Sequence, residues 1–145
     1  MRVMLLALLL AVVGAGVALA LDQRDEEGSF YGWRPHPPET AEEKAAAASA
    51  SAYVRAILAQ RADRACEHAA GATFRRLRCA RAQPRIPRGL QLSTDGRVSV
   101  YHVNVRGATA SVELSNLVPG PAHAFTLQRL GGTWRVFADD AFARA

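Results

Sequence analysis

The hydrophobic period changes once along this chain, and that change limits the fold more than any other feature. Between Thr40 and Gln60 the apolar residues recur at steps of three and four, which indicates a helix with one apolar face. From residue 97 onward they alternate with polar residues, which is typical of strands. Pro84 and Pro87 separate the helical part of the chain from the alternating part, because proline ends a helix. Helices followed by strands predict an α+β domain.

The first helix has a recognisable start. Thr40 stands before Glu42 and Glu43, which gives a capping residue and two acids in the first turn, where the helix macrodipole favours negative charge. Its predicted buried face consists of Ala46, Ala50, Tyr53, Val54, Ile57 and Leu58. Two shorter helical pieces are expected at 62–68 and 73–82, with Gly71 interrupting them.

Four strands are expected, at residues 97–105, 109–118, 123–130 and 133–138. A phase slip near His102 predicts a β-bulge in the first of them. Gly131-Gly132 is typical of a two-residue hairpin turn, and the pairs 106–107 and 95–96 also suggest turns. Short turns between consecutive strands predict an antiparallel meander.

The run Val3–Leu21 holds 19 residues without a charged or strongly polar side chain, after the single cation Arg2. Its end, at Ala18-Leu19-Ala20, has the small-x-small pattern of a signal-peptidase site. We therefore expect residues 1–20 to be either a cleaved signal peptide or an uncleaved N-terminal membrane anchor, since the length lies between the two classes. Both alternatives place the rest of the chain outside the cytoplasm, secreted or anchored to the cell membrane.

Residues 21–40 are rich in proline, glycine and acids and are predicted to be a linker. Residues 41–145 are then the single folded domain, long enough to bury a core without a metal. The aromatic cluster at 30–33 is unusual for a linker and suggests a short hook that docks on the domain or at the membrane interface.

The net charge is +5, and nine arginines fall between Arg55 and Arg88. Nucleic-acid binding is not expected, because only one aromatic residue, Phe74, is adjacent to the arginine cluster and the domain is exported. A solvated helix face explains the cluster Arg75, Arg76, Arg78 and Arg81, and attraction to anionic lipid headgroups is the second interpretation.

Cys66 and Cys79 are the two cysteines of the chain, 13 positions apart. An exported protein with an even cysteine count is expected to form a disulfide. Two unpaired thiols, or redox or metal chemistry, are the alternatives, although redox pairs are usually closer together.

Several segments resemble one superfamily. These are the end of the first helix at Tyr53–Leu58, the stretch 61–66 with Asp63 three residues before Cys66, and the closing hairpin 127–136 with its glycine turn and Trp134. Over residues 41–138 the chain is similar to small exported actinobacterial members of the nuclear transport factor two-like (SnoaL-like, ketosteroid isomerase-like) superfamily. The resemblance implies helices packed on a curved antiparallel sheet, a cone-shaped α+β barrel. It also implies a Cys66–Cys79 pair and a plausible sheet-face homodimer.

Enzymes of this superfamily place a general base in the cone, with a donor for the developing oxyanion. The resemblance therefore makes Asp63 and His102 candidate bases, and Tyr53 a candidate donor. His123 and Tyr101 are weaker candidates of the same kinds. Each has a structural interpretation: Asp63 opens a helix, His102 lies at a bulge or sheet edge, and His123 lies in a loop or at a strand start.

The common sequence motifs of metal sites and serine hydrolases are absent from the sequence. It contains no His-Glu-x-x-His pattern, acidic calcium loop or Gly-x-Ser-x-Gly elbow, so no metal, cofactor or serine nucleophile is expected. Asp139 and Asp140 follow the last predicted strand and are expected to be solvated.

These observations favour a non-catalytic, exported domain that binds a small apolar ligand or a protein partner. The alternative is a SnoaL-like isomerase, hydratase or cyclase in which His102 or Asp63 is the general base.

Overall fold

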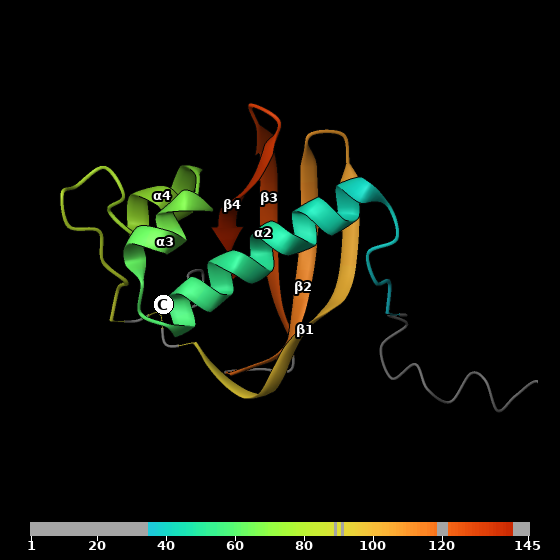
Figure 1. Ribbon diagram of the computed structural model, residues 1–145, viewed down its shortest axis with the longest axis horizontal. Coiled ribbons are helices and arrows are strands. Elements are labelled where there is room, and N and C mark those ends of the chain that lie inside the picture. Colours follow the sequence, from blue (N-terminus) through green and yellow to red (C-terminus); the bar gives the residue numbers. More distant parts are fainter. Residues whose placement is uncertain (1–34, 89, 91, 119–121, 141–145) are drawn as a thin grey trace, which may run out of the picture. The chain divides into compact units, whose positions relative to one another are not determined.

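The computed structural model describes residues 35–88, 90, 92–118 and 122–140 (Figure 1). Three helices come first and a four-stranded antiparallel sheet with strand order β1-β2-β3-β4 follows, which confirms the predicted α+β class. The predicted signal or anchor segment and residues 21–34 of the predicted linker lie outside the described residues. Within the described part of the chain, no helix is long and apolar enough to span a membrane.

Helix α2 spans Ala41–Leu58, and its start is fixed by a capping box. The Glu43 backbone N–H donates to the Thr40 hydroxyl at 3.2 Å, and the Glu43 carboxylate accepts from the Thr40 backbone N–H at 2.9 Å. A third hydrogen bond, from the Glu39 N–H, reaches the same carboxylate. The capping residue and the helix that the sequence predicts are therefore confirmed.

The Glu43 cap makes stability depend on pH in the acid range. Hydrogen bonds from the backbone N–H groups of Thr40 and Glu39 lower the pKa of Glu43 from its ordinary value of 4.5 to about 2. Because the folded-state pKa is depressed, this stabilisation is present above pH 4.5 and is lost as the pH falls from 4.5 through about 2. We expect the difference in free energy of unfolding between the wild type and Glu43→Gln to shrink over that interval, as measured by urea denaturation. A difference that does not change with pH would contradict this role.

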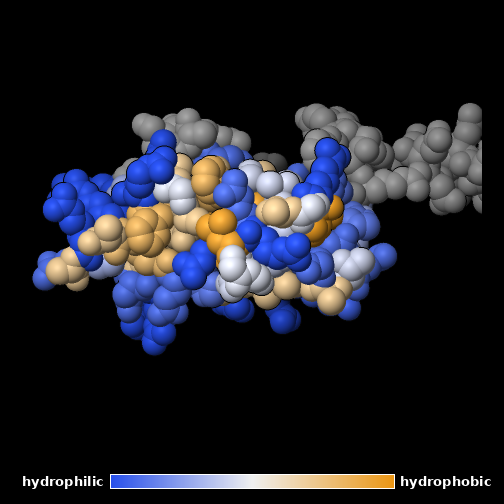
Figure 2. All heavy atoms as spheres, turned by 90° about the horizontal axis from the view of Figure 1, so that it is seen from above, coloured by the Kyte–Doolittle hydropathy of each residue, from blue (hydrophilic) through white to orange (hydrophobic). Residues whose placement is uncertain are grey.

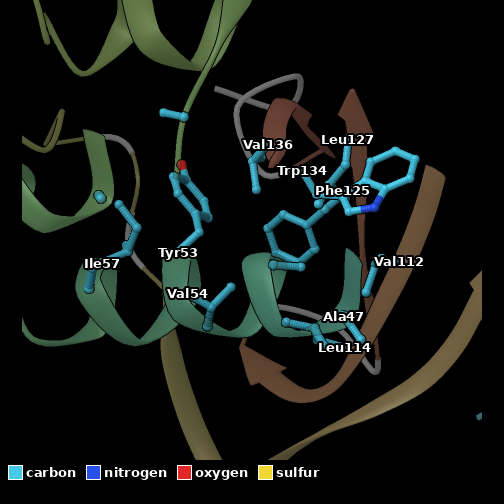
Figure 3. Close-up of a cluster of buried hydrophobic side chains, with 14 of the residues drawn as sticks. Ala47, Tyr53, Val54, Ile57, Val112, Leu114, Phe125, Leu127, Trp134 and Val136 are labelled. Atoms are coloured by element: carbon cyan, nitrogen blue, oxygen red, sulfur yellow. The ribbon is translucent and has the colours of Figure 1, made fainter. Parts of the chain in front are cut away.

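The core lies between α2 and one face of the sheet (Figures 1 and 3). Five of the six residues predicted to form the buried face of α2 are fully buried, and Leu58 is partly buried. They pack against sheet residues that are also fully buried: Val103, Val112, Leu114, Phe125, Leu127 and Val136. The Ser49 hydroxyl donates to the Trp134 carbonyl at 2.7 Å and joins the helix to β4.

Helices α3 (Ala62–Glu67) and α4 (Gly71–Arg76) are short, and a disulfide joins Cys66 of α3 to Cys79, three residues after the end of α4. The predicted disulfide is thus present, with the two Cα atoms 5.5 Å apart. The prediction for the third helix was wrong at both ends, since α4 starts at Gly71 and stops at Arg76. Arg78 has φ +56°, a left-handed conformation that a helix cannot continue through.

The strands are β1 (Ser93–Arg106), β2 (Thr109–Val118), β3 (Ala122–Leu130) and β4 (Thr133–Asp139), close to the predicted ranges. Gly131 and Gly132 form the β3–β4 turn with positive φ at both positions, as the sequence indicates. The turn predicted at residues 95–96 is wrong. These residues lie inside β1, where the register with β2 shifts between Thr94 and Ser99. The Asn116 side-chain amide donates to the Arg97 carbonyl there, at 2.8 Å.

A bulge in β1 confirms the phase slip expected near His102. Val100 pairs with Leu114, but His102 pairs with the next residue of β2, Glu113, so Tyr101 is the additional residue. Residues paired across a sheet share a face. Leu114 is in the core, and His102 therefore lies with Glu113 on the sheet face opposite to α2.

A second bulge lies in β4. Val136 pairs with Leu127 and Ala138 pairs with Thr126, so Phe137 is the extra residue on this strand. The segment between α3 and α4 lies along the outer edge here, because the Ala70 N–H donates to the Val136 carbonyl at 2.8 Å.

Gly71 is required beside this bulge. It has φ +51°, and a Cβ at this position would overlap the Phe137 ring. Only glycine adopts this backbone conformation without strain and leaves room for the ring.

Candidate functional site

A buried polar cluster lies where three elements meet. It consists of Tyr53 from α2, His123 from β3, Asp139 at the end of β4 and Asp140 just after it. His123 is 2% exposed and Asp139 is 4% exposed, so two ionisable groups lie on the core side of the sheet. Buried polar groups of this kind are uncommon and usually have partners.

Tyr53 and Asp139 form one half of the cluster. The Tyr53 hydroxyl donates to Asp139 Oδ2 at 3.4 Å, and its ring meets Phe125 edge to face (Figure 3). Burial, together with the nearby Asp139 carboxylate, raises the pKa of Tyr53 well above its ordinary value. The phenol therefore stays neutral at physiological pH and acts as a hydrogen-bond donor.

His123 and Asp140 form the other half. His123 Nδ1 lies 3.2 Å from Asp140 Oδ1, and the Asp140 side chain is 30% exposed. Each of these residues can offer one atom to a metal ion, a ring nitrogen or a carboxylate oxygen. The three atoms, from His123, Asp139 and Asp140, lie within 4.8 Å of one another. The cluster is therefore closed toward the core and reaches solvent through Asp140.

The expectation that Asp139 is solvated was wrong, and the β4 bulge is the reason. Asp139 comes three positions after the buried Val136. In a regular strand the two side chains would therefore lie on opposite faces, and Asp139 would point away from the core. The extra residue Phe137 reverses the alternation, so that Asp139 pairs with Phe125 and shares its buried face. His123 was predicted in a loop or at a strand start, and it is the second residue of β3. His123 is two residues before Phe125 and four before Leu127, so alternation along the strand places all three on one face. This spacing was the signal that His123 faces the core.

The three candidate catalytic residues from the sequence occupy separate places. Tyr53 is in the cluster. Asp63 is in the first turn of α3, 57% exposed, and its carboxylate pairs with the Arg61 guanidinium at 2.9 Å. This hydrogen bond to Arg61 lowers the pKa of Asp63, which keeps it ionised. An exposed, ion-paired carboxylate is poorly suited to be a general base at neutral pH.

His102 lies on β1, at the far edge of the sheet from Asp139. Three strand spacings separate β1 from β4, or about 14 Å. Its ring lies against His36, with ring centroids 5.7 Å apart, where the His36 backbone pairs with β1. A base at this position would act on the outer face of the sheet, away from the space between α2 and the sheet.

A second candidate site is an arginine-lined hollow after α4. Its volume is about 590 Å³, and its lining residues are Arg76, Arg78, Arg85, Ile86, Pro87 and Arg88. The segment is fixed at its base: the Arg85 N–H donates to the carbonyl of the fully buried Leu77, and Cys79 is held by the disulfide. Throughout the described residues, no carboxylate pairs with Arg78, Arg85 or Arg88. We call these six residues the arginine hollow.

Comparisons of the chain with protein-family models, with curated proteins and with solved structures found no match. Function must therefore be inferred from the two sites themselves.

Proposed function

We propose that this chain is an exported, non-catalytic binding domain that recognises phosphate-bearing groups at the cell envelope through the arginine hollow. The observation that carries the proposal is the convergence of four arginines on one concave surface. Guanidinium groups suit phosphate because their planar fork donates two hydrogen bonds to it. The disulfide beside the hollow supports it, because a fixed segment loses less entropy on binding.

A second observation favours a surface ligand over an apolar one held inside the domain. The space between α2 and the sheet is occupied by side chains of the protein (Figure 3). Tyr53, Leu114 and Phe125 are each fully buried there. An apolar ligand would have to be inserted into this packed core, and overpacking a core typically costs about 1–3 kcal/mol. The surface in Figure 2 mixes hydrophilic and apolar side chains, as expected of a domain that faces water.

Export is supported by the disulfide, which fits an oxidising compartment outside the cytoplasm. We propose that residues 1–20 supply the targeting signal or anchor. An anchored chain would keep the domain at a membrane that carries phospholipid headgroups, and a secreted chain would meet other phosphate-bearing material of the envelope.

We also propose that the domain has the nuclear transport factor two-like cone fold. Support comes from the order of its elements, a long helix, two short helices and an antiparallel meander, and from α2 lying across one face of the sheet (Figure 1). The bulges at Tyr101 and Phe137 also support it, because bulges bend strands and curve a sheet.

The function is tested by vesicle binding of the full-length chain. Each arginine near an anionic surface contributes about 1 kcal/mol. Replacing Arg78, Arg85 and Arg88 by alanine is therefore expected to lower the ratio of binding to phosphatidylglycerol over phosphatidylcholine vesicles about 100-fold. The apolar N-terminus can insert into both types of vesicle, and the ratio removes this shared contribution to binding. The ratio is also expected to fall with added salt.

The matched control is Arg55→Ala/Arg97→Ala/Arg106→Ala, which removes the same charge from other exposed positions. It should retain most of the vesicle preference. Competition by soluble glycerol 1-phosphate in the wild type would identify the phosphate itself, rather than the lipid surface, as the ligand. Equal ratios in the two triple variants would contradict a role for the arginine hollow.

Acid–base catalysis is the second candidate function, and the buried cluster is what favours it. His123, with Asp139 and Tyr53 beside it, is a better-placed base than His102 or Asp63. Turnover of a steroid- or polyketide-like ketone that is lost in His123→Ala would favour this candidate over binding alone.

A further inference from the structure

The buried cluster brings together three side chains that can each bind a metal ion. Two carboxylates meet the single imidazole of His123: Asp139 is buried like the imidazole, and Asp140 is 30% exposed. Burial of carboxylate charge is costly unless positive charge compensates for it. A protonated imidazole offsets one of the two charges, whereas a divalent cation bound by neutral imidazole offsets both.

The distances suit shared coordination. Two ligand atoms bound at about 2.0 Å to one tetrahedral ion lie about 3.3 Å apart. His123 Nδ1 and Asp140 Oδ1 are 3.2 Å apart, and Asp139 contributes a third ligand atom within the same 4.8 Å group. One imidazole and two carboxylates form a donor set that Zn²⁺ and similar divalent transition metals accept.

The surroundings provide the other parts of a metal site. The Tyr53 hydroxyl donates to Asp139 Oδ2 and orients that carboxylate from outside the donor set. Asp140, at 30% exposure, gives an ion a route from solvent. The residues also come from different segments, β3 and the end of β4, so a bound ion would join the two ends of the sheet's last hairpin.

We propose that His123, Asp139 and Asp140 form a binding site for one divalent transition-metal ion, with Zn²⁺ as the representative. Three protein ligands leave a fourth position for water or a small ligand. The ion connects β3 to the residues that follow β4 and is expected to stabilise the fold by mass action. This site is independent of the arginine hollow and of the function proposed for it.

The test uses the full-length chain after removal of metal with EDTA and of EDTA by gel filtration. Equilibrium dialysis against Zn²⁺, with the metal measured by mass spectrometry, is expected to give one ion per chain. Asp140→Asn should bind at least tenfold more weakly, since loss of a metal ligand or its orienting partner usually weakens binding by 10–100-fold. Added Zn²⁺ should raise the thermal midpoint of the wild type and not that of Asp140→Asn.

His36→Ala and Asp63→Asn are the matched controls, because they remove an exposed imidazole and an exposed carboxylate elsewhere. Both should retain one ion per chain, which separates the cluster from adventitious binding at His36 and Glu43. His123→Ala is a second test, and Asp140→Asn keeps the proposal testable if that variant fails to fold. Cobalt substitution should give visible absorption bands of a low-symmetry site with one nitrogen ligand. Less than one ion in the wild type, or unchanged affinity in Asp140→Asn, would overturn the proposal.

Discussion

Tyr53→Ala is expected to lower the free energy of unfolding by about 4 kcal/mol, because large-to-small changes of buried aromatic residues remove both apolar burial and packing. Tyr53 is fully buried, and its ring packs edge to face on Phe125 with centroids 6.1 Å apart. The same substitution also removes the hydroxyl that donates to the buried Asp139. Urea denaturation followed by circular dichroism measures the effect.

Tyr53→Phe separates these two contributions. It keeps the ring in the core and removes the hydroxyl alone, so a loss of about 1–2 kcal/mol is expected from the weakened hydrogen bonding of Asp139. A loss below 1 kcal/mol in Tyr53→Ala would mean that this residue is not at the centre of the core. Equal losses in both variants would mean that the hydroxyl carries the whole effect.

Replacement of Cys66 and Cys79 by alanine is expected to destabilise the domain by about 3 kcal/mol. The disulfide closes a loop between residues separated by 13 positions, and the chain-entropy relation gives that magnitude for a loop of this length. The effect is large here because α3 and α4 have only six residues each, too short to be stable helices alone. Urea denaturation of the oxidised wild type and the double variant makes the comparison.

Two controls accompany the cysteine experiment. Reduction of the wild type should lower its stability to about that of the double variant and raise its mass by about 2 Da. The preference for phosphatidylglycerol vesicles should also fall, because Cys79 helps to fix the arginine hollow. Thiols that react in the untreated, denatured wild type would contradict the disulfide.

Much of the fold was predictable because its signals are local. The Thr40 cap with its first-turn acids and the apolar face of α2 depend on residues close together in the sequence, and both are confirmed. Alternation of apolar and polar residues also predicted strands close to β2 and β3, and apolar residues of both, including Val112 and Leu127, are buried. The bulge at Tyr101 also left a local trace, as a break in the alternation.

The candidate sites were less predictable because they depend on long-range pairing. The β4 bulge forms where the strand meets the segment before Gly71, a contact between residues more than 60 positions apart. That bulge alone moves Asp139 from the solvent side to the core side. Asp63 and His102 were candidates because their residue types suit a base, but residue type does not determine the face on which a side chain lies.

By itself the sequence determined the α+β class, the helix-then-meander order, the capped helix and the cysteine pair, because each follows from spacing along the chain. Only the tertiary structure decided that Tyr53, His123, Asp139 and Asp140 meet, and that the arginines after α4 surround a hollow. The physical reason is that a site is an arrangement in space. Strand register, bulges and the disulfide bring its members together, and each of these depends on contacts between distant parts of the chain.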